Sequence, residues 1–314
     1  MNLVSNKISK WESLFCKNST PITQVADFMG VKLSVKRDDL NHQIVQGNKL
    51  RKLKYNFKHV IENNYSTVIT FGGAWSNHIL ATAQATQICG LKCVGFIRGD
   101  ELHNHPEKWS KTLIKAQESG MELIFLDRHH YRQKHRSKTV GIYFENLKNQ
   151  PYIVPEGGSN SLALEGIIEI PSELKQQLSK PTHIITACGT GGTLAGLIDG
   201  VADIGWNTCV IGIPVLKGAQ YLHQEVEQLS KFHDQVNWQM FYNYHAGGYA
   251  KIDNKTLSFG LKFFQDTKLK LDKIYNAKSF YATYDLIKRG FIKPGSHVVI
   301  LHTGGLQGGL IAEP

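Results

Sequence analysis

The sequence predicts an α/β protein built on parallel sheets with helices on both faces. Short, almost continuously apolar segments recur along the chain, and most of them end in a glycine-rich turn followed by a helical pattern. Apolar strands that alternate with helices are typical of parallel sheets covered on both sides. In such sheets ligands bind beyond the carboxyl ends of the strands, which is where these turns lie.

The strands and turns can be placed along the chain from this pattern. A helix through Ile79 to Ala83 follows the first glycine pair, and no repeat, low-complexity tract or proline-rich linker interrupts the order. Glycine turns follow four of the strands, at residues 72–73, 157–158, 189–192 and 304–305. The predicted strands are Thr67 to Phe71, Cys93 to Ile97, Leu123 to Leu126, Tyr152 to Val154, His183 to Ala187, Val210 to Val215 and His297 to Leu301.

Length and composition indicate an ordinary globular protein. A chain of 314 residues corresponds to about two domains. Its apolar content of 41% and charged content of 20% are typical of water-soluble proteins. No window approaches the roughly 18 uninterrupted apolar residues of a membrane span, and Met1 to Lys10 lacks the apolar core of a secretory signal. We therefore expect a cytoplasmic protein with no membrane partner.

The net charge of +10 points to acidic partners such as phosphates or carboxylates. The densest basic run, Arg128 to Lys138, lacks the repeated aromatic residues of a nucleic-acid stacking surface. We interpret it as a solvated loop and expect no nucleic-acid partner, with a weak nucleic-acid patch as the alternative. The five cysteines are scattered, and His129-His130 has no further ligand at helical spacing. The pattern predicts neither a disulfide framework nor a metal site.

An amphipathic helix with an unusual basic start is predicted after Gly47-Asn48, which supplies a loop and an N-cap. Leu50, Leu53 and Phe57 form its apolar stripe. Lys49 and Lys52 leave one edge of the helix, and Lys49 falls in the first turn. A cation is unfavourable at that end, and other cations lie close by, so the neutral amine is favoured. Such an amine suits Schiff-base chemistry, although a solvated basic face is the simpler interpretation of these residues alone.

The turn from Gly189 to Thr193 suits a phosphate group. Glycines allow backbone amides to approach an anion, and the start of the following helix offers more unpaired donors. The turn is not a nucleotide P-loop, because no Gly-Lys-Ser/Thr sequence closes it. It is not the dinucleotide fingerprint either, because position 194 is Leu194. A tight turn without a ligand remains the alternative.

Two further groups of polar residues are candidates for a site. Ser76-Asn77-His78 follows a glycine pair and places polar side chains and amides where a helix begins, which suits a carboxylate. The alternative is that Ser76 or Asn77 only caps the helix. Tyr249 and Tyr275 stand in loop-like sequence, and without other support each is expected only to pack.

Taken together, these segments resemble the D-cysteine desulfhydrase and 1-aminocyclopropane-1-carboxylate (ACC) deaminase family. The resemblance implies fold type II of the pyridoxal-phosphate enzymes, with two open, twisted, mostly parallel sheets flanked by helices. It implies a large domain of residues 1–48 and 152–314, a small domain of residues 49–151 inserted in it, and an active site in the cleft between them. The matching segments run in register from about Pro21 to Gly305 and are Lys36 to Leu40, Gly47 to Leu53, Gly72 to His78, Gly157 to Asn160, Gly189 to Thr193 and His302 to Gly305.

The resemblance also implies how the cofactor, pyridoxal 5'-phosphate, is held. Lys49 resembles the lysine that bonds to the cofactor aldehyde, and Lys52 resembles a ligand of the phosphate. Asn77 matches the asparagine at the ring hydroxyl, and Thr303 matches the residue that faces the pyridine nitrogen. The phosphate cup would consist of Gly189, Thr190, Gly191, Gly192 and Thr193.

The substrate side is assigned in the same way. Ser76, Asn77 and His78 match positions that hold the substrate carboxylate, and Ser76 is also expected to move a proton. Tyr249 and Tyr275 resemble the two active-site tyrosines, with Tyr275 the acid–base group near the leaving atom. No metal is implied.

Two positions bear on the reaction that the resemblance implies. ACC deaminases tend to carry Glu where this chain has Asn276, and Leu where it has Thr303. A neutral hydroxyl at Thr303 would not hold the ring nitrogen protonated, which favours α,β-elimination. We expect elimination from a small amino acid, D-cysteine giving pyruvate, ammonia and hydrogen sulfide, by a homodimeric enzyme. The alternatives are ACC deamination to 2-oxobutanoate and, more remotely, a non-catalytic binding protein on the same fold.

Overall fold

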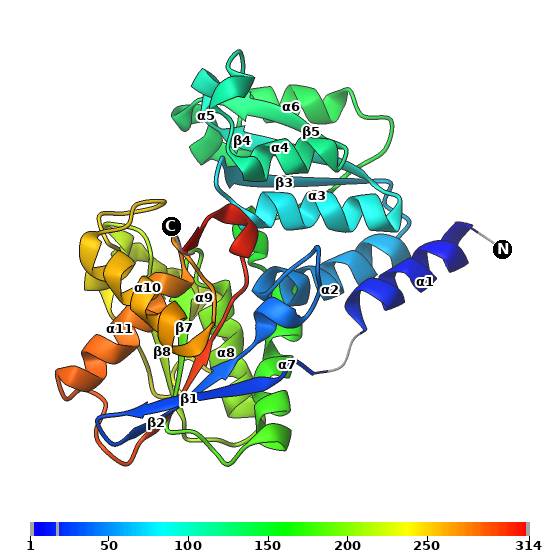
Figure 1. Cartoon of the computed structure of the whole chain (residues 1–314). Helices are drawn as coiled ribbons and strands as arrows, with labels where there is room; N and C mark the ends of the chain where they lie inside the picture. Colours follow the sequence, from blue (N-terminus) through cyan, green and yellow to red (C-terminus); the bar gives the residue numbers. More distant parts are fainter. Residues whose placement is uncertain (1–2, 17–18, 312–314) are drawn as a thin grey trace.

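The computed structural model describes residues 3–16 and 19–311, and its strands form two main sheets (Figure 1). The larger sheet is parallel apart from its first strand, which runs antiparallel to the second. The smaller sheet is parallel throughout. The larger sheet has the order β1 (Ile22–Phe28), β2 (Val31–Lys36), β11 (His297–Leu301), β7 (His183–Cys188), β8 (Cys209–Pro214), β9 (Trp238–Met240), and the smaller has the order β5 (Met121–Leu126), β4 (Lys92–Arg98), β3 (Thr67–Gly73), β6 (Tyr152–Val154).

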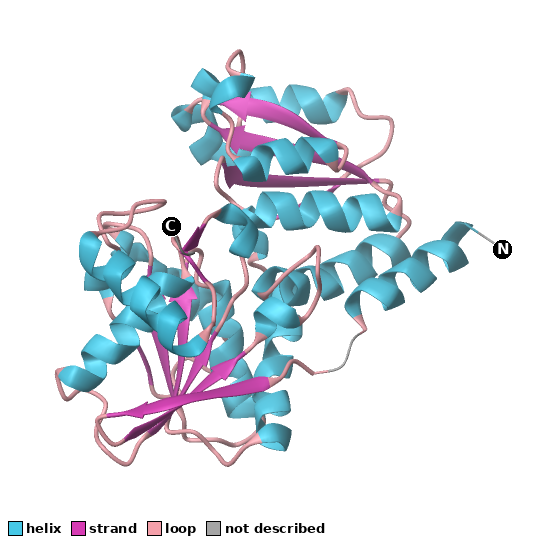
Figure 2. Ribbon diagram, in the orientation of Figure 1, coloured by secondary structure: helices cyan, strands magenta, loops and turns pink. Residues whose placement is uncertain are grey.

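Helices cover both faces of each sheet (Figure 2). On the larger sheet, α10 and α11 pack on one face and α7, α8 and α9 on the other. A short antiparallel pair, β10 (Leu271–Asp272) with β12 (Leu310–Ile311), lies beside α11. The helices are α1 (Leu3–Phe15), α2 (Asn48–Glu62), α3 (Asn77–Cys89), α4 (Lys111–Glu118), α5 (Arg128–Gln133), α6 (Lys138–Glu145), α7 (Ser161–Gln177), α8 (Gly192–Asp203), α9 (Leu222–Leu229), α10 (Asn254–Thr267) and α11 (Asn276–Lys288).

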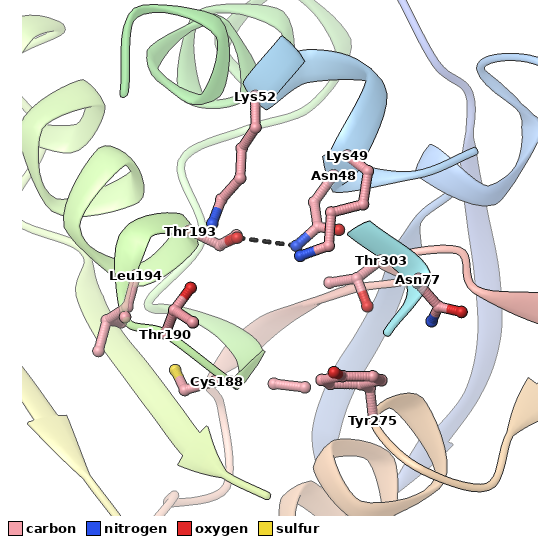
Figure 3. Close-up of a pocket in the computed structure, with 13 residues that line it drawn as sticks. Asn48, Lys49, Lys52, Asn77, Cys188, Thr190, Thr193, Leu194, Tyr275 and Thr303 are labelled. Carbon is pink, nitrogen blue, oxygen red and sulfur yellow. Dashed lines mark hydrogen bonds between the residues drawn. The ribbon is translucent and has the colours of Figure 1, made fainter. Parts of the chain in front are cut away.

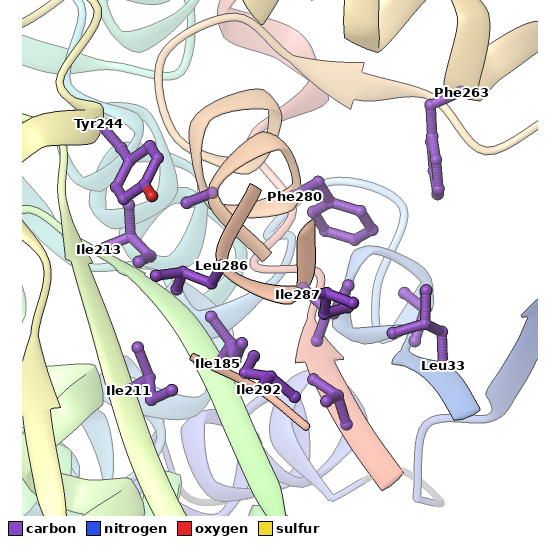
Figure 4. Close-up of a cluster of buried hydrophobic side chains, with 14 of the residues drawn as sticks. Leu33, Ile185, Ile211, Ile213, Tyr244, Phe263, Phe280, Leu286, Ile287 and Ile292 are labelled. Atoms are coloured by element: carbon purple, nitrogen blue, oxygen red, sulfur yellow. The ribbon is translucent and has the colours of Figure 1, made fainter. Parts of the chain in front are cut away.

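The main core lies between α11 and the larger sheet. Phe280 and Leu286 of α11 and Ile185 of β7 belong to one cluster of buried side chains, and all three are fully enclosed (Figure 4). Burial of a side chain of this size stabilises the fold by about 1.5–3 kcal/mol. This cluster fixes the sheet edge where the β7 and β11 turns emerge.

The predicted α/β class with mostly parallel sheets is confirmed, and each predicted strand is present within two residues of its expected ends. The predicted domain boundaries need correction, however. Residues 152–154, assigned to the large domain, form β6 and pair with β3 in the smaller sheet. Helix α1, assigned to the large domain as well, packs against α2 and α3 through Leu14 and Phe15.

The basic run at residues 128–138 is not the loop that its composition suggested. It forms α5 and a following 3-10 turn, Lys134–Arg136. Asp127 caps α5 by accepting the backbone N–H groups of His129 and His130, and Tyr131 is buried. The sequence pattern did not predict this helix, because only one of its side chains is apolar enough to indicate a buried face.

Candidate active site

Helix α2 is seated by its apolar stripe and by one buried arginine. Leu53 and Phe57 are fully buried, as their spacing predicted. Arg51 donates two hydrogen bonds to Asp38, at 2.7 and 2.8 Å, and pairs with Glu173 at 2.7 Å. Bidentate pairs of this kind fix geometry as well as charge. The first turn of α2, with Lys49 and Lys52, is therefore held rigidly.

Both lysines open into a cavity at the carboxyl ends of the strands. Figure 3 shows Lys49 and Lys52 entering it from α2, with Thr190 and Cys188 of the β7–α8 turn and Tyr275 lining other parts of the wall. All the sequence-predicted cofactor residues except Gly192 come together in its lining. The lining consists of Asn48, Lys49, Lys52, Asn77, Ala187, Cys188, Gly189, Thr190, Gly191, Thr193, Leu194, Tyr275 and Thr303.

Lys49 carries an amine suited to nucleophilic attack. No described residue gives its Nζ a hydrogen bond or ion pair, and burial lowers its pKa to about 8. The sequence suggested that neighbouring cations would favour the neutral amine. The structure assigns the effect to burial instead, because Arg51 is paired with Asp38 and Lys54 with Glu169 at 2.5 Å.

The turn between β7 and α8 forms a cradle for an anion. The ammonium of Lys52, almost fully buried, donates to Gly157 O at 3.1 Å and to Ser159 Oγ at 2.9 Å. A Cβ added to Gly192 would lie 2.9 Å from Lys52 Nζ, so only glycine leaves this space open. Burial, with the charge of Lys49, lowers the pKa of Lys52. An anion in the cradle would act against this shift and favour the charged form of Lys52.

Two residues that the sequence did not assign to the site hold this cradle together. Asn48 was expected to cap α2, but the N-cap is Gly47, at φ 71°, and Asn48 is the first helical residue. Its side chain donates to Thr193 Oγ1 at 2.8 Å. Ser159 accepts from Lys52 and lies 2.6 Å from Thr190 Oγ1. Only its position in the Gly157 to Asn160 segment hinted at this role.

The start of α3 offers unpaired donors. Ser76 is the N-cap residue, yet its hydroxyl makes no capping hydrogen bond, so the first N–H groups of the helix stay free for a ligand. Asn77 lies against Gly305, where an added Cβ would come within 2.3 Å of Asn77 Nδ2. Asn77 lines the main cavity, and Ser76 lines an adjoining one.

The imidazole of His78 is neutral and has no proton to offer a carboxylate. Thr70 Oγ1 donates to Val154 O at 2.9 Å, so at 2.7 Å from His78 Nε2 it must accept the ring proton. Nδ1 is then a bare acceptor, buried and without a hydrogen-bond partner among the described residues. Burial, with the charges of Lys49 and Lys52, lowers the pKa of His78 well below its usual value. Its backbone N–H, in the first turn of α3, is the group that suits a carboxylate.

The two tyrosines named from the sequence lie together. Tyr275 OH donates to Tyr249 OH at 3.3 Å, and Tyr249 OH donates to Trp75 O at 3.1 Å. Burial raises the pKa of Tyr249 to about 12 and raises that of Tyr275 well above its usual value. Both hydroxyls therefore hold their protons at neutral pH. Asp272 accepts the backbone N–H of Tyr275 at 2.8 Å, which fixes the ring at the start of α11.

The hydroxyl proton of Thr303 is already engaged in a hydrogen bond. Both its N–H and its Oγ1 donate to Asn276 Oδ1, at 2.9 and 3.2 Å. The Asn276 amide in turn donates to Asp272 Oδ1 and to Gly304 O. Thr303 therefore offers only lone pairs to the cavity.

The adjoining cavity shares Lys49, Gly189, Thr190 and Tyr275 with the first. It is also lined by Arg98 and Glu156, which the sequence analysis did not identify. Glu156 accepts from Tyr131 OH and from Lys134 Nζ, both at 2.6 Å. The basic run therefore reaches the site through these two residues. Arg98 makes no hydrogen bond or ion pair with any described residue and lies over Gly73.

These features fit pyridoxal phosphate. Its aldehyde needs an amine that loses its proton more readily than an ordinary lysine, which Lys49 supplies through its lowered pKa, and its phosphate needs the cradle at Lys52 and Gly192. Lys49 and this cradle open into one cavity, so a single small molecule can reach both. Among the described residues no group of three or more His, Cys, Asp or Glu side chains is arranged to hold a metal ion. None of the described helices has the length and apolarity needed to cross a membrane.

Comparison with known proteins agrees with pyridoxal phosphate as the cofactor. Residues 16–304 match the family described as "Pyridoxal-phosphate dependent enzyme". The bifunctional D-cysteine desulfhydrase/1-aminocyclopropane-1-carboxylate deaminase of Arabidopsis thaliana is 30% identical, over 89% of this chain and 73% of that protein. The D-cysteine desulfhydrase of Klebsiella pneumoniae is 26% identical, over 90% of each chain. A solved structure of an ACC deaminase homologue superposes with a TM-score of 0.82 at 25% identity and covers 95% of each chain.

Other solved structures of lower identity share the fold, among them a cystathionine β-synthase from Helicobacter pylori at a TM-score of 0.67. The lysine with a lowered pKa, the phosphate cradle and the family match over most of the chain lead to one conclusion. This chain belongs to the pyridoxal-phosphate dependent enzymes of fold type II.

Proposed function

We propose that this enzyme catalyses α,β-elimination from a small amino acid, with D-cysteine as the preferred substrate. One water is consumed, and pyruvate, ammonia and hydrogen sulfide are released. The observation that carries the proposal is the uncharged hydroxyl of Thr303, held by the neutral amide of Asn276. A hydroxyl has no negative charge to hold the ring nitrogen protonated, and this favours expulsion of a β-leaving group. The relatives named D-cysteine desulfhydrase support the same choice.

When bound, pyridoxal phosphate supplies the electron sink for the reaction. Lys49 anchors the aldehyde and, once released, removes the α-proton or leaves that task to Ser76. The free N–H groups of Asn77 and His78 hold the substrate carboxylate, and Arg98 lines the same adjoining cavity as His78. Tyr275, which is protonated at neutral pH, donates its proton to the departing sulfur, and Tyr249 keeps it in place.

A lysine exchange tests the anchor. Lys49→Ala should remove the visible absorption band that forms when a lysine amine bonds to the cofactor aldehyde, because no other free amine lies at that point of the cavity. Lys54→Ala is the matched control on the same helix, since Lys54 pairs with Glu169 instead of lining the cavity. An unchanged spectrum in Lys49→Ala would end the assignment.

ACC deamination to 2-oxobutanoate and ammonia is the second candidate, because relatives carry that name as well. Measuring pyruvate released from D-cysteine against 2-oxobutanoate released from ACC separates the two. We further propose a cytoplasmic location, on the ground of the ordinary globular composition, and a homodimer, on the ground of the family resemblance. A solution mass of twice 35.2 kDa would support the dimer, and a monomeric mass would exclude it.

A further inference from the structure

A buried lysine outside the cofactor cavity has no evident role in the fold. Lys278 is fully enclosed, and it stands in the first turn of α11, three residues after the N-cap Tyr275. A cation is unfavourable at the start of a helix, and a buried ammonium is costly unless it is paired. Asp253 and Asp272 attract it only from beyond ion-pair distance, and no described carboxylate pairs with it directly. Local preferences that fail in this way often mark a functional position.

The hydrogen bonds of Lys278 lead to the loop that carries Tyr249. Its Nζ donates to Gly248 O at 2.9 Å and to Val215 O, just beyond β8, at 3.3 Å. Gly248 is 30 residues away in the sequence and immediately precedes Tyr249. The ammonium therefore ties the helix that starts at Tyr275 to the backbone beside Tyr249.

The loop at residues 246–250 needs a hydrogen bond of this kind to hold its backbone. Its backbone turns through left-handed conformations at Ala246 (φ 51°), Gly247 (φ 93°), Gly248 (φ 126°) and Ala250 (φ 58°). Two of these residues are alanines, which rarely adopt this region. Such a segment persists only when its surroundings hold it. Lys278 donates a hydrogen bond to Gly248 O, at the centre of this loop, in addition to the contact of Tyr249 OH with Trp75 O.

We propose that Lys278 is a positioning residue that sets Tyr249 against Tyr275, so that the proton of Tyr275 is held for the leaving group. The inference rests on the proposed function, because it assumes that the two tyrosines act in proton transfer. Lys278 itself lines neither of the two cavities of the site. Burial lowers its pKa to about 8, and its N–H donors remain available on both sides of that value.

The test compares Lys278→Met with Thr283→Val. Both residues are fully buried on α11, but Thr283 only donates to Ser279 O within the helix. With D-cysteine as the probe, Lys278→Met should lower kcat at least about tenfold with KM changed less than about twofold, while Thr283→Val leaves kcat unchanged. If Lys278→Met does not fold, Lys278→Gln replaces it in the test. Because glutamine keeps N–H donors, this variant should lower kcat by less than about tenfold.

Two further readouts separate positioning from a general structural role. In the Tyr249→Phe background the loss caused by Lys278→Met should shrink to less than about twofold, because the two residues act through one hydroxyl. In the cofactor-free protein, amide exchange of residues 246–250 should speed up at least about tenfold in Lys278→Met and stay unchanged in Thr283→Val. Unchanged kcat, an equal loss in both backgrounds, or unchanged exchange would each overturn the proposal. If the wild type forms no product from D-cysteine or ACC, the proposed function fails instead. The exchange measurement then still tests whether Lys278 holds the backbone of residues 246–250 in place.

Discussion

The chemistry of single residues in this site is set by their hydrogen-bond partners. Lys49 and Lys52 are three residues apart on one helix, yet Lys49 Nζ has no partner among the described residues and Lys52 Nζ has two. The first is therefore suited to bond formation, and the second to holding an anion. His78 gives the same lesson, because its hydrogen bond with Thr70 decides that its ring cannot donate to a substrate.

The lowered pKa of Lys49 predicts the pH dependence of cofactor attachment. With a pKa of about 8, against 10.5 for a free lysine, about one amine in ten is neutral at pH 7. The rate at which pyridoxal phosphate bonds to the cofactor-free protein should rise about tenfold per pH unit below pH 8 and level off above it. Stopped-flow absorbance measures this rate, with Lys49→Ala as the blank. A rate that still rises steeply to pH 10 would show that burial does not depress this pKa.

At the scale of elements, the site depends on where helices begin. α2, α3, α8 and α11 all start at the carboxyl edges of the sheets, and each brings its first turn to one of the two cavities. Helix α8 suits anion binding, because its first residue is Gly192 and an added Cβ there would fill the space beside Lys52.

Gly192→Ala should weaken cofactor binding by steric exclusion alone. The backbone at Gly192 suits any residue, but the added Cβ would lie 2.5 Å from Ser159 Oγ and 2.9 Å from Lys52 Nζ. We expect the Kd for pyridoxal phosphate, measured by fluorescence titration of the cofactor-free protein, to rise at least about tenfold, or about 1.4 kcal/mol. Gly141→Ala on α6 is the matched control, because nothing lies within 4 Å of its added Cβ. Equal Kd values for the two variants would contradict the assignment of the space beside Gly192 to the cofactor phosphate.

At the scale of the whole molecule, the cavity joins the two sheets. Its lining comes from α2 and α3, which pack with the smaller sheet, and from the turns and helices at the edge of the larger sheet. A ligand bound there contacts both halves of the structure at once. Binding should therefore stabilise the molecule as a unit.

Pyridoxal phosphate should raise the melting temperature of the cofactor-free protein, and the rise should continue with concentration. A ligand at one hundred times its Kd adds about 2.7 kcal/mol to the free energy of unfolding. Differential scanning fluorimetry measures the shift, and amide exchange should slow in both α2 and α8. The shift should shrink in Gly192→Ala. Protection confined to one of these helices would argue against a ligand that bridges the sheets.

The sequence by itself determined the elements and the cofactor. Apolar runs marked the strands, the stripe of Leu50, Leu53 and Phe57 marked α2, and the glycine turns marked the ligand edge. These signals are local, since periodicity and turn chemistry depend on neighbours within a few residues. Family motifs then placed Lys49 and the turn at residues 189–193 in one site, as the cavity shows.

Only the tertiary structure decided how those residues behave. The cause of the lowered pKa of Lys49, the proton on His78, the acceptor face of Thr303 and the link from Lys278 to Gly248 all depend on partners distant in the sequence. Lys52, for example, meets Ser159 across 107 residues. Burial and hydrogen-bond partners arise when the chain packs. For this reason the helix at residues 128–133 and the contacts of Glu156 could not be foreseen from composition.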